Sequence, residues 1–290
     1  MINLKQKIEQ ERNLKKVPWD VIEKDYVLSW ILAGMSEVEE IKNLLVFKGG
    51  TALKKFYFGD YRYSEDLDFT ILDNSVERSV LENLINKACK ASQRLMEQTM
   101  PSFPMQASLY IEKQPHPKGQ VAFVIKTQLP WHRELHVRSL IEITFQETLI
   151  YKPIYKKIIH EYEEALSSEL QVYPLEEIII EKVKAILSNF EKLHERGWAR
   201  SRVRDYYDLW WIFKRYKQDL NLNNFKENFQ KKYPDTQGTF SNYQDFFKSD
   251  SVAQVESTWG QWLSPLQYTI PSSREVIEDL KESLKEVFPA

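Results

Sequence analysis

The sequence has little of three features that would each have restricted its class: cysteine, long apolar runs and an excess of charge of one sign. Cys89 is the single cysteine among 290 residues, which rules out a disulfide within the chain and fits a reducing compartment. It lies in a helix-like stretch without nucleophile partners, so we interpret it as a packing residue. No apolar run approaches the roughly 18 residues that a membrane-spanning helix needs. The first 20 residues are charged throughout, which argues against a secretory signal, and the expected location is cytoplasmic.

Charge is balanced over the whole chain, with a formal net charge of −2 at pH 7. Composition alone therefore excludes a generally polyanion-binding protein. Residues 192–217 are an exception, because basic residues outnumber acidic ones there. A local basic patch of this kind can hold phosphates or a nucleic-acid backbone. A solvated helix face has the same appearance, so both interpretations stay open. The basic residues of this segment are Lys192, Arg196, Arg200, Arg202, Arg204, Lys214, Arg215 and Lys217, against Glu195, Asp205 and Asp208.

The order of apolar patterns divides the chain into two halves, with no internal repeat or low-complexity segment. Short apolar or alternating runs predict strands in the first half, and a turn-rich segment at 114–119 predicts a hairpin. From about residue 151 the pattern becomes helical. We therefore expect an α+β fold: a small mixed β-sheet core with an N-terminal helical segment (domain 1–150) and a helical C-terminal half (domain 151–290). The predicted strands are 44–47, 67–72, 107–112, 121–127 and 137–145.

Helices are predicted between and around these strands. Asp20 with Glu23 resembles a capping box, and Ser272 with Glu275 caps the last helix. The predicted helices of the first half are about 3–14, 20–33, 51–58 and 75–96.

A glycine-rich turn follows the first predicted strand. Gly49, Gly50 and Thr51 stand between a strand and a helix, where glycines let the backbone approach a ligand and helix amides favour a phosphate. The Thr51 hydroxyl can add a donor. Many strand-to-helix turns use glycine for geometry alone, so this turn is weak evidence by itself.

Two aspartates follow at alternate positions of the next strand. Asp66 and Asp68 should project from one face, and Leu67, Phe69 and Ile71 from the other. Neighbouring carboxylates repel unless a cation neutralises them, and hard oxygen ligands suit Mg²⁺. An isolated pair of this kind is more often a solvent-facing acidic edge. Together with the preceding turn, however, the pair has the layout of metal-assisted nucleotidyl transfer.

The motifs resemble those of a known family. The runs KGGTALK at 48–54 and RYSEDLDF at 62–69 are similar to AbiEii/AbiGii-type nucleotidyltransferases, which are toxins of bacterial abortive-infection and toxin–antitoxin systems related to the MenT toxins. This family belongs to the DNA polymerase β-like nucleotidyltransferase superfamily, with Gly-Gly-Thr in place of the usual Gly-Ser turn. The resemblance implies that the sheet is a nucleotidyltransferase core. It covers about residues 40–215.

Later segments extend the resemblance. The superfamily usually has a third carboxylate on a later strand, which implies Glu142 as a metal ligand, although an ordinary exposed glutamate is the alternative. The runs EIIIEKVKA at 177–185 and RDYYDL at 204–209 match family motifs whose functional lysine and aspartate map to Lys182 and Asp205. In a helical projection Lys182 falls about 40° from Ile178, within the apolar arc. A lysine there is costly unless it meets an anion.

Two interpretations of this lysine are compatible. Lys182 and Asp205 could form a buried ion pair, and the pair could also place the amine on the NTP phosphates, with Asp205 orienting it. We expect both residues to be catalytic.

Other side chains near the motifs have two interpretations each. Arg62 and Ser64 precede the aspartates closely enough to reach the same triphosphate, and we include them with the turn as nucleotide-binding residues. Lys48 and Lys54 flank the turn, or are solvated. Four aromatic residues could stack a base but are more often core: Tyr206, Tyr207, Trp210 and Trp211.

The resulting hypothesis is a toxin enzyme that moves a nucleoside monophosphate from an NTP onto an acceptor. Mg²⁺ is the expected cofactor, with Mn²⁺ as the alternative. The resemblance makes tRNA the first choice of acceptor and implies a cognate antitoxin. The same chemistry on a protein or small-molecule hydroxyl remains an alternative, as does an NTP-binding regulatory module without turnover. The paired aspartates favour an enzyme, because pure binding does not need them.

Overall fold

The computed structural model describes residues 4–98, 101–111, 119–236 and 240–289. The chain forms two compact units. The first unit consists of residues 1–147 and 153–173, and the second of residues 148–152 and 174–290. The sequence-based boundary at 150/151 therefore differs from this division, because residues 153–173 return to the first unit.

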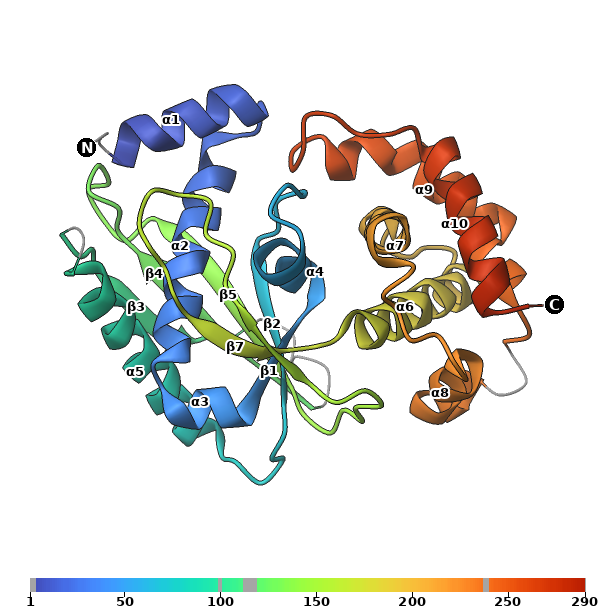
Figure 1. Ribbon diagram of the computed structural model, residues 1–290, viewed down its shortest axis with the longest axis horizontal. Helices are drawn as coiled ribbons and strands as arrows, with labels where there is room; N and C mark the ends of the chain where they lie inside the picture. Colours follow the sequence, from blue (N-terminus) through green and yellow to red (C-terminus); the bar gives the residue numbers. More distant parts are fainter. Residues whose placement is uncertain (1–3, 99–100, 112–118, 237–239, 290) are drawn as a thin grey trace. The chain divides into compact units, whose positions relative to one another are not determined.

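The first unit is built on a mixed sheet with the strand order β3-β4-β5-β2-β1-β7-β6 (Figure 1). β2 pairs with β5, and β1 with β7, in parallel, whereas the other neighbours are antiparallel. This confirms the α+β class and the mixed sheet. The strands are β1 (Leu45–Lys48), β2 (Asp66–Ile71), β3 (Met105–Leu109), β4 (Gln120–Thr127), β5 (Val137–Thr144), β6 (Ile154–Lys157) and β7 (Glu169–Val172).

Helices of the first unit pack on this sheet. α2 is apolar on nearly all sides and contacts α5 as well as β5, while α5 also contacts β3. Cys89 on α5 is buried, and burial raises the pKa of its thiol to about 12, as expected of a packing residue. The helical elements are α1 (Leu4–Lys15), α2 (Trp19–Ser36), α3 (Glu39–Leu44), α4 (Gly49–Ala52), the π-helical turn η1 (Leu53–Tyr57) and α5 (Arg78–Met96).

All five predicted strands are present, but two further strands and α3 were missed. The prediction of helices from residue 151 onward was wrong for β6 and β7. β6 is mostly exposed and carries two lysines, and β7 is only four residues long, so neither has a strong apolar pattern. The strand predicted to residue 112 ends at Leu109; residue 112 and the hairpin turn at 114–118 lie outside the described residues.

One predicted helix cap was wrong and one was confirmed. α2 begins after Pro18 without a side-chain cap, and Glu23 is turned into the protein instead. Its carboxylate accepts hydrogen bonds from the indoles of Trp19 and Trp131. Ser272 caps α10 (Ser273–Val287) by accepting from the Glu275 backbone amide at 3.2 Å.

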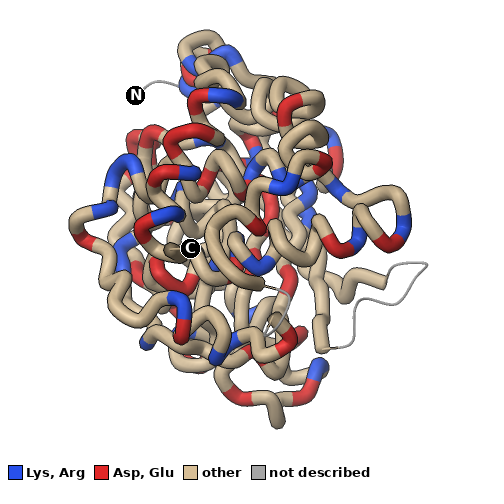
Figure 2. Tube along the Cα trace, turned by 90° about the vertical axis from the view of Figure 1, so that its right-hand side faces the viewer, with Lys and Arg blue, Asp and Glu red and all other residues tan. Residues whose placement is uncertain are grey.

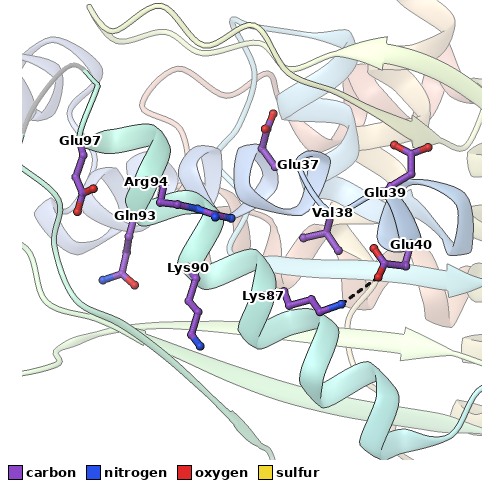
Figure 3. Close-up of a pocket in the computed structure, with 9 residues that line it drawn as sticks. All are labelled: Glu37, Val38, Glu39, Glu40, Lys87, Lys90, Gln93, Arg94 and Glu97. Atoms are coloured by element: carbon purple, nitrogen blue, oxygen red, sulfur yellow. Dashed lines mark hydrogen bonds and ion pairs between the residues drawn. The ribbon is translucent and has the colours of Figure 1, made fainter.

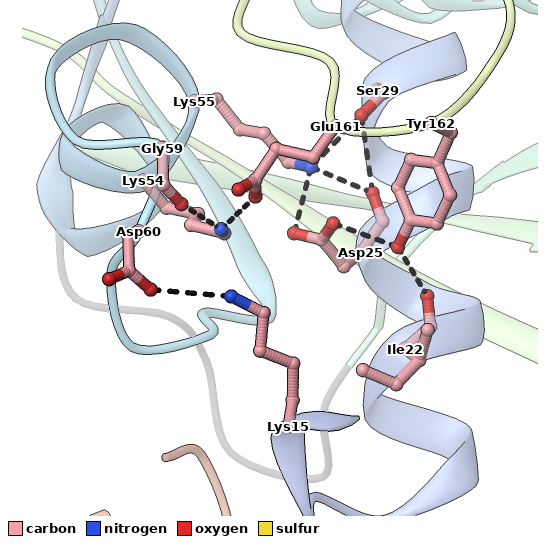
Figure 4. A network of polar contacts seen from close by, with 10 residues as sticks. All are labelled: Lys15, Ile22, Asp25, Ser29, Lys54, Lys55, Gly59, Asp60, Glu161 and Tyr162. Carbon is pink, nitrogen blue, oxygen red and sulfur yellow. Dashed lines mark hydrogen bonds and ion pairs between the residues drawn. The ribbon is translucent and has the colours of Figure 1, made fainter. Parts of the chain in front are cut away.

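Two consecutive lysines on η1 are buried within a network of polar contacts (Figure 4). The Lys55 ammonium lies 2.7 Å from Asp25 Oδ1 on α2 and donates to Ser29 Oγ at 2.9 Å. Lys54 pairs with Glu161 and donates to the Gly59 carbonyl. Burial by itself raises the pKa of Asp25, but the ammonium groups of Lys55 and Lys54 outweigh it, so the pKa of this carboxyl lies below its ordinary value.

Removing one partner of this network should be costly. Lys55→Met leaves the buried Asp25 carboxylate without its cation, which we expect to lower the free energy of unfolding by about 3–5 kcal/mol. Urea unfolding, followed by circular dichroism, measures this change in the free energy of unfolding. Lys87→Met, at an exposed pair with Glu40, is the matched control and should change stability by less than about 0.5 kcal/mol. Equal effects of the two substitutions would contradict this role of the network.

The second unit is helical in its described part. Its core includes a cluster of buried aromatic rings that contact one another, formed by Phe225, Phe229, Phe240, Phe246 and Phe288. The Glu177 carboxylate binds Lys232 at 2.6 Å and accepts from the backbone of residues 150 and 151, which ties the segment 148–152 to this unit. The main helices are α6 (Leu175–Arg196), α7 (Val203–Tyr216), α8 (Phe225–Lys232), α9 (Ser249–Leu263) and α10 (Ser273–Val287).

Basic and acidic residues are interspersed along the trace (Figure 2), and their totals nearly balance. Among the described helices, none has the length and apolar character needed to cross a membrane.

Candidate functional site

The glycine turn is shaped around an aspartate of β2. Gly49 follows β1 directly and has φ +81°, a conformation that L side chains rarely adopt. A Cβ at this position would lie 2.5 Å from Asp68 Oδ2. The backbone conformation and the nearby carboxylate therefore both require glycine. The sequence predicted the turn and the aspartate separately, and the structure brings them together.

The second glycine is equally enclosed. A Cβ on Gly50 would lie 2.7 Å from Arg62 Nη2 and 3.2 Å from Ser64 Oγ. Arg62 is buried, and its guanidinium also donates to the Tyr63 carbonyl at 3.2 Å. Two predicted nucleotide-binding residues thus lie against the turn, and Ser64 is the more exposed of them.

We expected the Thr51 hydroxyl to donate a hydrogen bond to a phosphate, but in the structure it donates to the protein backbone. This hydroxyl is buried and donates to the Asp66 carbonyl at 2.5 Å. This hydrogen bond fixes the glycine turn to the start of β2. The backbone amides of the turn are then the groups left to contact a phosphate.

The strand register places the acidic residues side by side. Asp66 and Asp68 alternate with the buried Leu67 and Phe69, and both aspartates are half-buried. Glu142 on β5 is the direct neighbour of Asp68 in the parallel pair. Because paired residues point to the same face of a sheet, the three carboxylates share one face.

The three carboxylates are chemically suitable ligands for a divalent cation. Carboxylate oxygens are the hard ligands that Mg²⁺ prefers, and Gly49 leaves space beside Asp68 that a Cβ would fill. Within the described segments, however, no three His, Cys, Asp or Glu side chains converge into a metal-holding group. The arrangement therefore suits a cation held by Asp66 and Asp68 together with phosphate oxygens and water, and Glu142 has the right register without completing a three-residue group.

Lys48 completes a charged row across the sheet. It is the antiparallel neighbour of Asp68, opposite Glu142 on β5. Its ammonium pairs with Glu147, whose carboxylate also accepts from Thr70 at 2.8 Å. Lys48 and Lys54 are therefore both held by carboxylates, and the interpretation of either as a freely solvated lysine was wrong.

The second unit contains a separate buried cluster around Lys182. The side chain of Lys182 on α6 is mostly buried, and its ammonium lies 3.0 Å from Asp205 Oδ1 on α7. Asp208 is closer, at 2.6 Å, and is fully buried. Arg202 approaches the other oxygen of Asp205 at 3.5 Å. The predicted ion pair between Lys182 and Asp205 is present, but Asp208 is a second carboxylate that binds the same lysine.

The sequence analysis missed Asp208. Its signal was available: Asp208 lies between Tyr207 and Leu209 on a helix with a strong apolar face, where an acid needs a cation. Three of the four aromatic residues nearby are core, as the more common interpretation expected, and the fourth, Trp211, is half-buried. Tyr206, Tyr207 and Trp210 are buried, and their polar atoms bond to Phe246, Gln267 and Asp279.

A surface pocket of the first unit lies elsewhere (Figure 3). α5 contributes Lys87, Lys90 and Arg94 to it, and residues 37–40 form the other wall. Lys87 bridges the two sides to Glu40 at 3.0 Å. None of the motif residues lines this pocket, so we do not connect it with the chemistry.

Adding one methyl group at the turn should damage the site. Gly49→Ala forces an L side chain into a left-handed conformation and pushes a Cβ against Asp68. We expect a loss of about 1–2 kcal/mol in stability and at least about a hundredfold in nucleotidyl transfer. Gly119→Ala is the control: its φ is +89°, but the added Cβ would meet only the Phe145 carbonyl oxygen, at an ordinary contact distance of 3.7 Å. It should show the backbone cost alone, and an equal loss of activity in both variants would contradict the argument.

The comparisons with known proteins agree with this layout. The family model "Nucleotidyl transferase AbiEii toxin, Type IV TA system" matches residues 30–286. The mixed sheet thus belongs to a nucleotidyltransferase, which is an enzyme. The chain belongs to the AbiEii family of nucleotidyltransferase toxins from type IV toxin–antitoxin systems, which implies an NTP substrate and a cognate antitoxin.

The fold has a match among solved structures. MenT4, a nucleotidyltransferase toxin from Mycobacterium tuberculosis H37Rv, superposes with a TM-score of 0.61 at 16% sequence identity, covering 97% of this chain and 87% of that one. No curated protein sequence matches. The motif resemblance ended near residue 215, whereas the family model continues to 286, so the C-terminal helices also belong to the family pattern.

Proposed function

We propose that this enzyme transfers a nucleoside monophosphate from an NTP to a hydroxyl of an RNA, with tRNA as the first candidate, in a Mg²⁺-dependent reaction. The observation that carries the proposal is the position of Asp66 and Asp68 on one face of β2, with Gly49 shaped around the second carboxylate. The family supplies the reaction class. Mn²⁺ is the alternative cation.

The residues of the first unit have separate roles in this proposal. The amides of Gly49, Gly50 and Thr51 bind the triphosphate, with Ser64 and the edge of Arg62 beside the second glycine. Asp66 and Asp68 hold the cation, with Glu142 as a neighbouring acceptor. When bound, a divalent cation neutralises phosphate charge and lowers the pKa of the attacking hydroxyl.

The overall reaction balances without a further reactant. The acceptor hydroxyl loses its proton and its oxygen bonds to the α-phosphorus, while the bond from that phosphorus to the bridging oxygen breaks and pyrophosphate leaves. We propose that Lys182 of the second unit binds the NTP phosphates, and that Asp205 and Asp208 are positioning residues that hold its amine. The resemblance of residues 177–185 and 204–209 to the family's functional motifs supports this role, and the two carboxylates hold the amine in one place.

Support for an RNA acceptor comes from the second unit. The basic segment 192–217 favours RNA over a neutral small molecule. The proposal places the reaction in the cytoplasm, where NTPs and RNA are found together.

The test is a labelling experiment. Purified protein is incubated with Mg²⁺, total bacterial tRNA and each α-³²P-labelled NTP in turn, beside an Asp68→Ala variant. Label in tRNA with wild type and none with the variant is the expected result, and it identifies the donor nucleotide. A labelled protein band in place of RNA would show that the acceptor is a protein. NTP binding without any labelled product would favour the regulatory module instead.

A further inference from the structure

Two segments of the second unit that contain no acidic residue pack against each other. Residues 196–204 contain four arginines and an exposed tryptophan, and residues 257–274 contain neither Asp nor Glu. Gln254 of α9 donates to the Ala199 carbonyl at 2.7 Å, and Ser201 bonds to Thr258 at 2.8 Å. We name residues 196–204 and 257–274 together the Arg–Trp surface.

Two of its guanidinium groups lie over one aromatic ring. The guanidinium groups of Arg200 and Arg204 lie 5.4 Å and 5.3 Å from the ring centroid of Trp262. A guanidinium over an aromatic face still has N–H groups at its rim that can donate to a phosphate, and of the two Arg200 is exposed whereas Arg204 is half-buried. Side chains fixed in this way lose less rotamer entropy when a ligand binds.

Exposed rings accompany these cations. Trp198 is 69% exposed and Tyr268 is 68% exposed, one on each segment of the surface. Large aromatic rings are costly to leave in water, and unpaired nucleic-acid bases stack on them with little regard to sequence. An acidic protein would use the arginines but would gain less from such rings.

The surface is also continuous with the Lys182 cluster. Arg202 belongs to the first segment and approaches the Asp205 carboxylate, which holds the Lys182 ammonium at 3.0 Å. A chain of phosphates bound along the Arg–Trp surface would therefore end beside the lysine that we assign to the NTP.

We propose that the Arg–Trp surface binds the acceptor RNA through a single-stranded stretch, with arginines on its phosphates and Trp198 and Tyr268 stacked on its bases. This inference rests on the proposed function and identifies the part of the chain that selects the acceptor. Arg200, Arg204, Trp198 and Tyr268 would be acceptor-binding residues.

Binding is tested separately from chemistry. The full-length protein is titrated, without NTP, into a fluorescein-labelled hairpin RNA with a single-stranded 3′ end, and anisotropy is followed at several salt concentrations. Arg200→Gln/Arg204→Gln should weaken binding about tenfold or more and reduce the log–log salt slope by about 1.4, because two phosphate contacts are lost. Trp198→Ala or Tyr268→Ala should weaken binding at least about fivefold without changing the slope.

A matched pair of exposed lysines provides the control. Lys231→Gln/Lys285→Gln removes the same charge from α8 and α10 of the same unit and should leave RNA binding within about twofold of wild type. Thermal melts confirm that all variants are folded. Arg200→Lys/Arg204→Lys should restore part of the salt slope, since the charge returns without the planar fork.

The outcomes separate this inference from the proposed function. If RNA is labelled in the transfer assay but the arginine variant binds RNA as well as the lysine control does, the Arg–Trp surface is not the RNA site and the proposed function stands. If polyglutamate competes as effectively as RNA, the surface binds acidic protein and the inference is overturned. If wild type has no affinity for RNA and labels a protein, both the acceptor and this surface assignment are wrong.

Discussion

Asp68→Asn should reduce nucleotidyl transfer about a thousandfold or more while the protein remains folded. The substitution keeps the size of the side chain, so the space beside Gly49 is preserved, but it removes the charge that the proposed divalent cation would need. NTP affinity in the absence of Mg²⁺ should change little, because the amides of the turn remain. The measurement is the single-turnover rate of label transfer at saturating NTP, together with NTP binding by equilibrium dialysis with and without Mg²⁺.

Neighbouring carboxylates give this experiment its controls. Glu65→Gln removes a charge three residues away, at a side chain that pairs with Lys24 at 3.4 Å and lies outside the alternating pair, so activity should stay within about threefold of wild type. Asp66→Asn should behave like Asp68→Asn. Glu142→Gln tests the third acidic position, with a smaller loss expected because no three-carboxylate group forms in the described residues. Full activity of Asp68→Asn would remove the basis of the metal-assisted mechanism.

The second large effect is expected at the buried lysine of α6. Lys182→Met should lower transfer at least about a hundredfold and, because Asp208 is left buried without a cation, lower the free energy of unfolding by about 3–5 kcal/mol. The two aspartates should then differ. Asp208→Asn should cost mainly stability, since that carboxylate is fully buried, whereas Asp205→Asn should cost mainly activity, since it is partly exposed and also contacts Arg202.

Stability and activity have to be measured in the same preparations. Urea unfolding gives the first, and the dependence of single-turnover rate on NTP concentration gives the second, at a temperature where every variant is folded. Lys182→Arg is the informative control, because it keeps the cation and should regain stability more than activity. A variant set in which activity simply follows stability would assign this cluster a purely structural role.

Combining the two sites asks whether the two units serve one reaction. The double variant Asp68→Asn/Lys182→Met should be hardly slower than Asp68→Asn alone, because residues that act on the same step have strongly non-additive effects. Multiplicative losses would indicate that Lys182 acts in a different step, such as acceptor binding.

Much of the fold and of the site was predictable because its signals are local. The strand, the glycine turn and the alternating aspartates lie within residues 45–71, and each follows from spacing along the chain. The register that sets Glu142 beside Asp68 was not predictable, because strands far apart in the sequence pair through tertiary packing. β7 was missed for the same reason: it pairs with β1 across more than a hundred residues and has almost no pattern of its own.

Buried charged residues were the other feature that the sequence analysis did not predict correctly. Lys54 and Lys55 stand in an otherwise apolar segment, and Asp208 stands on the apolar side of α7. Spacing shows that such a residue is buried, but not which partner reaches it. Asp25 lies 30 positions from Lys55, and Glu161 lies 107 positions from Lys54. A charged residue within an apolar arc is therefore better interpreted as half of a pair whose second member remains to be found.

The return of residues 153–173 to the first unit has a consequence for how this enzyme is made. During synthesis, the ribosome releases β1, β2 and the paired aspartates long before β7, the neighbour of β1. Glu161, which holds Lys54, also arrives late. A nascent chain cut after the fifth strand would thus have an open sheet edge and an uncompensated lysine. For a toxin, this order of synthesis delays a finished catalytic unit until the second unit has already begun to emerge.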